Sequence, residues 1–266
     1  MKIGITQLCI KGSLAEVIEK TIGWGYEALE IELTLKDGIL NLDDPAQKAV
    51  ASAQIVRDAG LDFASVVGGS FSDCSLFDAD AGKRTLGLDR LRRTLDLLAR
   101  MQVRTLLLVP GTLVPEVCYD VAMQLLVESL SKVSSYAQER GVDIGLENVW
   151  NRFLVSPLDM RSVLDQVDSS SVGVYLDIGN MVPWNYPEHW IRILANRIIA
   201  VHFKDLKREG CHFNFVPLMQ GDVNWKSVMR ELKACGYCGP AVSEVVGDDA
   251  TQARMVAIMK TIISYQ

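Results

Sequence analysis

The segment QERGVDIGLENVW, residues 138–150, contains the unit that decides the fold. A charged stretch runs into Gly141, an apolar run begins at 143, and Glu147 stands near the end of that run. Glycine directly after a helix is a common signal for the helix C-terminus. A nearly continuous apolar run is typical of a strand that is covered on both faces, as in parallel sheets. The segment therefore predicts a helix, a tight turn and a buried parallel strand.

The same unit recurs along the chain. RDAGLD (57–62) and KACGY (233–237) repeat the glycine turn, while 83–101 and 120–140 have the three- and four-residue apolar spacing of amphipathic helices. We predict eight strands, in the apolar runs 2–7, 28–33, 62–68, 105–109, 143–149, 173–177, 198–204 and 241–245. Eight units in 266 residues leave about 33 residues each, enough for a strand, a helix and the return.

These units predict an α/β protein with a single (β/α)8 TIM barrel domain over residues 1–266. The alternative is an open, doubly wound sheet, which often binds a dinucleotide through a glycine-rich first turn. The turn after the first run reads TQLCIKGSL (6–14) and lacks the pattern G-x-G-x-x-G. The barrel is therefore the favoured fold.

Composition excludes several classes of protein. Hydrophobic residues make up 49% and charged residues 23%, which is ordinary for a globular chain, and the net charge of −6 argues against a nucleic-acid partner. Lys11 and Glu16 interrupt the apolar start of the chain, which argues against a secretory signal. The apolar runs of the chain are shorter than the roughly 20 residues of a membrane span. Six scattered cysteines do not form a disulfide framework, so we expect a cytoplasmic protein without a membrane partner.

Ionisable residues stand at the ends of four successive predicted strands. They are Glu147, Asp177, His202 and Glu244. In a TIM barrel these ends meet at one rim, where burying a charge without a partner costs several kcal/mol. Any one of them alone could equally be a helix N-cap or an ion-pair partner. The nearby Asn148 and Asp205 are not in the predicted metal set; they could support the ligands or, at least as readily, cap the next helix. Together, the four residues at the strand ends predict a site that binds a divalent cation.

Three carboxylates and one imidazole form a ligand set made mainly of oxygen. Such a set suits Mn²⁺, Mg²⁺ or Co²⁺ better than a structural zinc site rich in sulfur. We expect one divalent ion, with Mn²⁺ the first choice and Mg²⁺, Co²⁺ or Zn²⁺ also compatible. Open coordination positions would let the ion polarise a carbonyl and stabilise an enediolate.

The motifs LENVWNRF, LDIGN, VHFKD and SEV, in this order, resemble those of the xylose isomerase-like barrels, a family that includes sugar phosphate isomerases and ketose 3-epimerases. The resemblance spans almost the whole chain. It implies that Glu147, Asp177, His202 and Glu244 bind the metal and that the two glutamates are the catalytic acid and base. It also implies metal-site or substrate roles for Asn180 and Arg208.

The chain departs from the ketose 3-epimerases at two positions. Leu154 follows the N-R-F stretch where enzymes acting on free ketoses carry a further glutamate, and Asn180 stands where several have histidine. A standard free ketohexose is therefore not the expected substrate. Lys204, Lys207 and Arg208 are candidates for binding a phosphate, although basic loop residues are more often solvated.

Other residues have both functional and structural interpretations. Trp150, Trp184 and Phe71 could stack on a sugar ring or pack within their loops, and His212 could reach the substrate. Cys235 and Cys238 form C-x-x-C in a turn on the opposite face, without a second such pair or a nearby histidine, so we expect a structural role.

The sequence thus predicts a metal-dependent sugar or sugar phosphate epimerase that works through an enediolate, with a small-molecule substrate and a dimeric or tetrameric assembly. Aldose-ketose isomerisation, metal-assisted dehydration and a purely sugar-binding role are the alternatives. The two glutamates argue against the last one. Three histidines and the net negative charge argue against an endonuclease IV-type enzyme, which needs a cluster of zinc-binding histidines.

Overall fold

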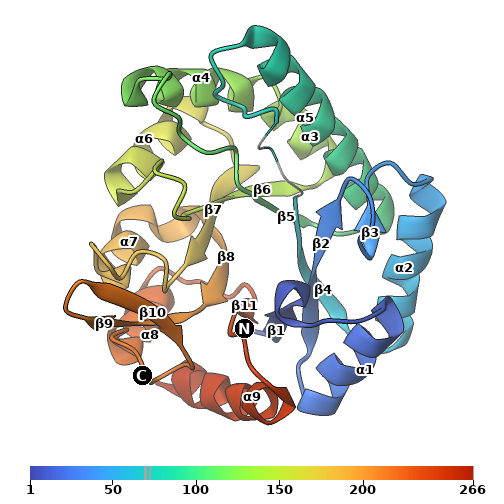
Figure 1. The fold of residues 1–266 in the computed structure, drawn as a ribbon, viewed down its shortest axis with the longest axis vertical. Helices are drawn as coiled ribbons and strands as arrows, with labels where there is room; N and C mark the ends of the chain where they lie inside the picture. Colours follow the sequence, from blue (N-terminus) through green and yellow to red (C-terminus); the bar gives the residue numbers. More distant parts are fainter. Residues whose placement is uncertain (69–70, 72, 266) are drawn as a thin grey trace.

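Eight parallel strands close into a barrel in the computed structural model, which describes residues 1–68, 71 and 73–265 (Figure 1). The sheet follows the chain order, and β1 closes it by pairing with both β2 and β11. The barrel strands are β1 (Ile3–Thr6), β2 (Ala28–Thr34), β4 (Asp62–Val67), β5 (Thr105–Leu108), β6 (Asp143–Glu147), β7 (Val172–Asp177), β8 (Ile198–Phe203) and β11 (Ala241–Ser243). The predicted single TIM barrel domain and its eight strands are confirmed.

Helices surround the barrel, as Figure 1 shows. They are α1 (Leu14–Trp24), α2 (Ala46–Asp58), α3 (Ala81–Met101), α4 (Tyr119–Ser131), α5 (Ser134–Arg140), α6 (Pro157–Val167), α7 (Pro187–Leu194), α8 (Trp225–Ala234) and α9 (Asp249–Ser264), with short 3-10 turns at η1 (Gln7–Cys9) and η2 (Ala195–Arg197). Gly141 ends α5 with φ of +65°, in the left-handed region where glycine carries no steric penalty. The predicted helix-ending glycine of the opening segment is therefore confirmed.

The prediction of one continuous helix over 120–140 is wrong. The chain breaks between α4 and α5, where Val133 leaves the helical region with φ of −124°. Leu130, Val133 and Ala137 are all fully buried. Apolar residues on both sides of the break thus belong to the buried core.

Two further strand pairs lie outside the predicted set. β3 (Leu40–Asn41) adds to β2, and an antiparallel hairpin of β9 (Asp205–Glu209) and β10 (His212–Val216) follows β8. The hairpin projects beside α7 and α8 in Figure 1. Its two strands form the segment that the sequence analysis assigned to a loop. None of the described helices is both long and apolar enough to cross a membrane.

Candidate metal centre

Four neighbouring strands bring the predicted ligand residues together. Glu147 and Asp177 are the last residues of β6 and β7, His202 lies in β8, and Glu244 directly follows β11. Asp177 pairs with His202 in the β7–β8 register. One potential ligand atom from each of the four residues lies within 4.8 Å of those from the others. The parallel barrel thus collects at one point side chains that are up to 97 residues apart in the sequence.

His202 directs its Nδ1 atom at the carboxylates. This nitrogen lies 3.1 Å from Glu147 Oε1, 3.1 Å from Glu244 Oε2 and 3.8 Å from Asp177 Oδ2. Asp177 and His202 are essentially inaccessible to solvent, whereas the Glu244 side chain is 21% exposed. The cluster is therefore buried on the barrel side and reached from the side of Glu244.

Two carboxylate oxygens of the cluster lack a normal hydrogen bond. Asp177 Oδ2 and Glu244 Oε2 are buried, and no described residue donates to either with acceptable geometry. The Lys204 ammonium lies 3.5 Å and 3.0 Å from these two oxygens. The ammonium offsets part of the charge of these buried oxygens, and a divalent cation would satisfy both. The donor set of three carboxylates and one imidazole fits such an ion.

The two glutamates differ in their affinity for protons. Burial raises the pKa of Glu147 to about 7. Burial acts on Glu244 in the same direction, but His202 and Lys204 outweigh it, and the pKa of Glu244 is lowered. Near neutral pH Glu147 can hold a proton while Glu244 is ionised. A pair of carboxyl groups whose pKa values are pushed apart is typical of an acid and a base that act together.

Glu30 is a buried member of this region that the sequence analysis missed. It lies in β2, and its carboxylate accepts hydrogen bonds from Ser65 and, at 2.7 Å, from Tyr175. Its Oε1 atom lies 3.0 Å from His202 Nε2. The available signal was a glutamate within ALEIELT (28–34), a run that is otherwise mostly apolar.

Asn148 and Asn180 support Asp177. The Asn148 side chain donates to the Asp177 carbonyl and accepts from the Asp177 N–H, both at 2.8 Å. The Asn180 N–H donates to Asp177 Oδ1 at 2.8 Å, and its side chain donates to the Asn148 carbonyl at 3.0 Å. Ser156 caps α6, so the helix-capping interpretation of Asn148 is wrong. Asn148 thus holds the Asp177 backbone, and the Asn180 N–H holds the Asp177 carboxylate.

Asp205 anchors the segment that follows β8. Its buried carboxylate accepts hydrogen bonds from the Trp225 indole and from four backbone N–H groups, those of Leu206, Met219, Gly221 and Val223. Asn224 caps α8, so a capping role for Asp205 is wrong. These contacts tie the base of the β9–β10 hairpin to the loop before α8.

Aromatic side chains form a rim next to the cluster. Trp150 stacks on Phe215 with ring centroids 5.2 Å apart and contacts Trp184 at 6.0 Å. The Trp150 indole donates to the Asn180 carbonyl at 2.7 Å, and the Lys204 ammonium lies 4.4 Å from the Phe215 ring centroid. Phe71, by contrast, is buried and packs inside the protein. The hairpin thus brings Phe215 to two tryptophans that the sequence places in separate loops.

A cavity of about 310 Å³ adjoins Glu244 on this side. Its lining residues are Lys204, Phe215, Val216, Pro217, Glu244, Val245 and Val246. Lys204 and Glu244 supply its charged groups, and the rest of the wall is apolar. A small molecule in this cavity would contact both the cluster and the hairpin.

Arg208 and His212 lie on the exposed part of the hairpin. The Arg208 guanidinium donates to the Gly210 carbonyl at 3.1 Å and lies 5.7 Å from the Phe213 ring centroid, and its backbone N–H donates to Asp222. His212 pairs with Glu209 in the hairpin register. No contact between either side chain and the cluster is found among the described residues. Their roles in substrate binding stay predictions.

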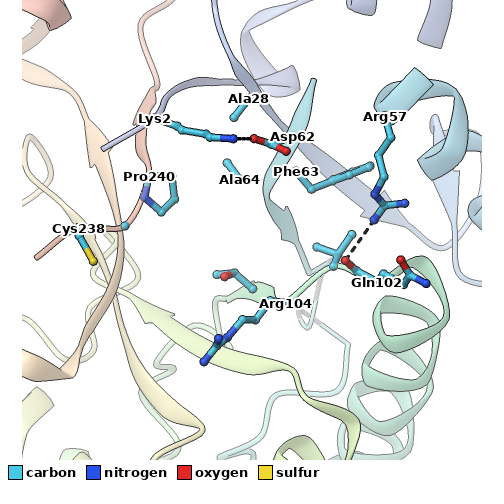
Figure 2. A pocket seen from close by; sticks show the side chains of 13 residues that line it. Lys2, Ala28, Arg57, Asp62, Phe63, Ala64, Gln102, Arg104, Cys238 and Pro240 are labelled. Atoms are coloured by element: carbon cyan, nitrogen blue, oxygen red, sulfur yellow. Dashed lines mark hydrogen bonds and ion pairs between the residues drawn. The ribbon is translucent and has the colours of Figure 1, made fainter. Parts of the chain in front are cut away.

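A second cavity of about 460 Å³ lies at the N-terminal end of the barrel (Figure 2). Lys2 pairs there with Asp62, and Arg57 donates to the Gln102 carbonyl at 3.1 Å. Cys238 lines this cavity, so the C-x-x-C turn lies at the end opposite the cluster. Residues at this end of a TIM barrel usually serve stability rather than chemistry.

Residues 18–262 match a family model described as xylose isomerase-like TIM barrel. The chain belongs to this family. An uncharacterized protein of Methanocaldococcus jannaschii is 25% identical over 249 residues, which cover 90% of this chain and 82% of that protein. The L-ribulose-5-phosphate 3-epimerase UlaE of Salmonella paratyphi C is 23% identical over 234 residues, which cover 88% and 81%.

Solved structures show the same xylose isomerase-like barrel. A D-tagatose 3-epimerase-like protein superimposes with a TM-score of 0.83 at 21% identity, over 99% of this chain and 97% of that one. An L-ribulose 3-epimerase and a D-psicose 3-epimerase are also among the structural neighbours. The relatives and neighbours that are named here by an activity are sugar epimerases, which are isomerases.

Proposed function

We propose that this xylose isomerase-like protein is a divalent-metal-dependent epimerase of a ketose or ketose phosphate, acting at the carbon next to the ketone. The observation that carries the proposal is the convergence of Glu147, Asp177, His202 and Glu244, with two buried carboxylate oxygens that lack hydrogen bonds. The activities of the named relatives and neighbours support the substrate class.

Glu147 and Glu244 are the proposed catalytic pair. In the sheet, β6 and β11 flank β7 and β8, so the two carboxyl groups approach from opposite sides of the Asp177–His202 pair. For one epimer, ionised Glu244 takes the proton from the substrate carbon, and Glu147 delivers to the opposite face a proton that it has taken up from solvent. For the other epimer the roles are reversed, and exchange with solvent restores the starting protonation state.

The four residues of the cluster are the proposed ligands of one divalent ion. When bound there, the ion would supply Lewis-acid stabilisation of the negative charge that develops on the substrate oxygens. Mn²⁺ is our first choice, and Mg²⁺, Co²⁺ and Zn²⁺ are compatible with three oxygen donors and one nitrogen donor. Asn148 and Asn180 would keep Asp177 oriented toward the ion.

The cavity beside Glu244 is the proposed substrate site. Lys204 would contact the polar end of the substrate, and Trp150 and Phe215 would cover its carbon face. Asn180, Arg208 and His212 remain proposed contributors from the cavity's surroundings. Of the predicted substrate residues, Trp150 has the best support, since it lies in the aromatic rim.

A homodimer or homotetramer in the cytoplasm is the proposed working form. Exposed aromatic side chains, among them Trp184 and Tyr186 at 55% and 65% exposure, support association through this end of the barrel. Light scattering coupled to size-exclusion chromatography would measure the assembly directly.

Solvent deuterium incorporation tests the proposed reaction. The Mn²⁺-loaded protein is incubated in D2O with a panel of ketoses and ketose phosphates, and recovered sugars are analysed by NMR. Epimerisation places deuterium on one carbon next to the ketone without moving the carbonyl. Movement of the carbonyl would instead indicate aldose-ketose isomerisation, and loss of water would indicate dehydration.

Glu244→Gln is the decisive variant for the two-base scheme. We expect its turnover to fall by about 10² to 10⁴, because a positioned acid-base group contributes a factor of this size. Metal content is measured in parallel, since Glu244 is also a proposed ligand. Glu19→Gln, which removes an exposed carboxylate on α1, is the matched control. Full turnover of metal-loaded Glu244→Gln would rule out the scheme.

A further inference from the structure

The Glu30 carboxylate is completely buried inside the barrel and has a partner at each oxygen. Ser65 and Tyr175 donate to Oε2, and His202 Nε2 lies 3.0 Å from Oε1. These partners come from β4, β7 and β8, so the network crosses the barrel interior. Each donor group is held on a strand, and the position of the carboxylate is therefore fixed.

The two ring nitrogens of His202 face different groups. Nε2 faces Glu30, whereas Nδ1 lies 3.1 Å from both Glu147 and Glu244. A neutral imidazole carries its proton on one nitrogen and offers the lone pair of the other. An ionised carboxylate can only accept, so Glu30 favours a proton on Nε2, and Glu244 favours one on Nδ1. A cation bound to Glu147 and Glu244 would displace the proton on Nδ1 and leave the one on Nε2. The lone pair of Nδ1 is then directed into the cluster.

A structural role alone explains Glu30 poorly. A fully buried charged network is often no more stable than apolar side chains of similar volume, because desolvation offsets the attraction. The hydroxyl groups of Ser65 and Tyr175 both donate to one oxygen of Glu30, and the other oxygen of Glu30 faces His202. We therefore interpret the network as one that orients the His202 imidazole.

We propose that Glu30 is a positioning residue that holds His202 as the Nε2–H tautomer, with Nδ1 free to bind a divalent cation. This inference rests on the proposed metal-binding role of the cluster. A carboxylate that accepts from the distal N–H of a ligating histidine fixes the ring and raises the basicity of the ligand nitrogen. Loss of such a partner typically weakens metal binding by about 10- to 100-fold.

Glu30→Gln is the variant that tests this role. The amide keeps the size of the side chain and removes its charge, so we expect the Kd for Mn²⁺ to rise about 10- to 100-fold in competition with a chromophoric chelator. Thermal unfolding of the metal-free variant is measured in parallel, because removing one partner of a buried charged pair also destabilises the fold. Co²⁺-loaded variant protein should also show an altered visible spectrum, because the electronic character of the histidine ligand has changed.

Two control variants separate the role at His202 from a general effect on the barrel. Ser65→Ala removes one donor to Glu30 but leaves the carboxylate facing Nε2. Glu27→Gln alters a glutamate just before β2, whose carboxylate accepts from the Ile3 N–H at 3.0 Å. We expect less than a threefold change in Kd for Ser65→Ala and none for Glu27→Gln.

A measurement on the wild-type protein keeps the inference testable even if Glu30→Gln does not fold. The chain has three histidines, so ¹⁵N-histidine labelling of the Zn²⁺-loaded protein gives few signals. His202 should show a protonated Nε2 that exchanges slowly with solvent and a metal-bound Nδ1. A protonated Nδ1, or unchanged Mn²⁺ affinity in a folded Glu30→Gln variant, would overturn the inference. If the wild-type protein binds no divalent cation, the proposed function itself fails, and this outcome precedes any comparison of variants.

Discussion

A proton and a divalent cation compete for the oxygens of the Glu147 carboxyl group. Its pKa is raised by burial to about 7, so the protonated form prevails below that pH. Binding of a divalent ion must displace this proton. We therefore expect Mn²⁺ affinity to fall as the pH decreases through about 7, as measured by isothermal titration calorimetry between pH 5.5 and 8.5.

Buffers of different ionisation enthalpy provide the check on this prediction. They should reveal that more protons are released per bound ion at pH 6 than at pH 8, because Glu147 is largely ionised at the higher pH. The Glu147→Gln variant, which cannot lose a proton at this position, should bind more weakly and release fewer protons. Equal proton release by both proteins at pH 6 would contradict the assignment to Glu147.

The sequence predicted residues at the ends of strands better than residues inside the barrel. Glu147, Asp177, His202 and Glu244 each interrupt or follow an apolar run, and strand ends in a barrel share one rim, so their meeting could be predicted. Glu30 lies well inside its strand, and its neighbours Ser65 and Tyr175 come from distant segments. Only the register between strands shows that these side chains meet.

At the scale of elements, Asp205 determines how the hairpin is held. Replacing it with alanine leaves the four backbone donors and the Trp225 indole without their shared acceptor. Hydrogen bonds to a charged group contribute about 1.5 to 3 kcal/mol each, and part of the loss is recovered by water. We expect Asp205→Ala to lower the free energy of unfolding by about 2 to 4 kcal/mol, measured by urea denaturation.

Asp222→Ala is the matched control for the hairpin. Asp222 accepts from Lys207 and from the backbone N–H of Arg208, but all three residues are largely solvent-exposed. Exposed ion pairs contribute about 0 to 1 kcal/mol, so this variant should be close to wild type in stability. Equal destabilisation by both substitutions would show that Asp205 is not the anchor.

The sequence correctly predicted those helices and strands for which the local pattern and the tertiary contacts agree. The strand runs and the glycine turns are local signals, and the structure confirms them. The break at Val133 was not predicted, because Leu130, Val133 and Ala137 keep the three- and four-residue apolar spacing of one continuous helix. The hairpin was missed because FNFV (213–216) is short and alternates with a polar residue, which a loop also tolerates.

At the scale of the whole molecule, the cluster links metal binding to folding. A ligand that binds only the folded state stabilises it by about 2.7 kcal/mol at a concentration of 100 Kd. For a chain of this size we expect a rise in Tm of about 5 to 10 °C over the protein dialysed against EDTA, measured by differential scanning calorimetry. The rise should disappear in the His202→Asn variant. The same rise in that variant would place the responsible ion elsewhere.

The closed barrel could be predicted because its repeating unit occurs eight times and each copy supports the others. The family match and the structural neighbours agree with it over nearly the whole length. The shape of the cavity beside Glu244 could not be predicted in the same way. Its wall combines Phe215 and Pro217 from the hairpin segment with Val245 and Val246 after the last strand, and this pairing depends on how the hairpin folds over the rim.

The anchoring of one hairpin by a single carboxylate has a consequence for how this catalyst can diversify. The proposed ion ligands belong to the barrel strands or their immediate ends. Phe215 and its neighbours belong to the hairpin segment, which is anchored at Asp205. We therefore expect that residues 206–222 can be exchanged for the corresponding segment of a relative without disturbing the strands that carry the proposed ion ligands. The chimeric protein would then have the sugar preference of the relative that supplied the segment, and it would keep the reaction of the protein that received it.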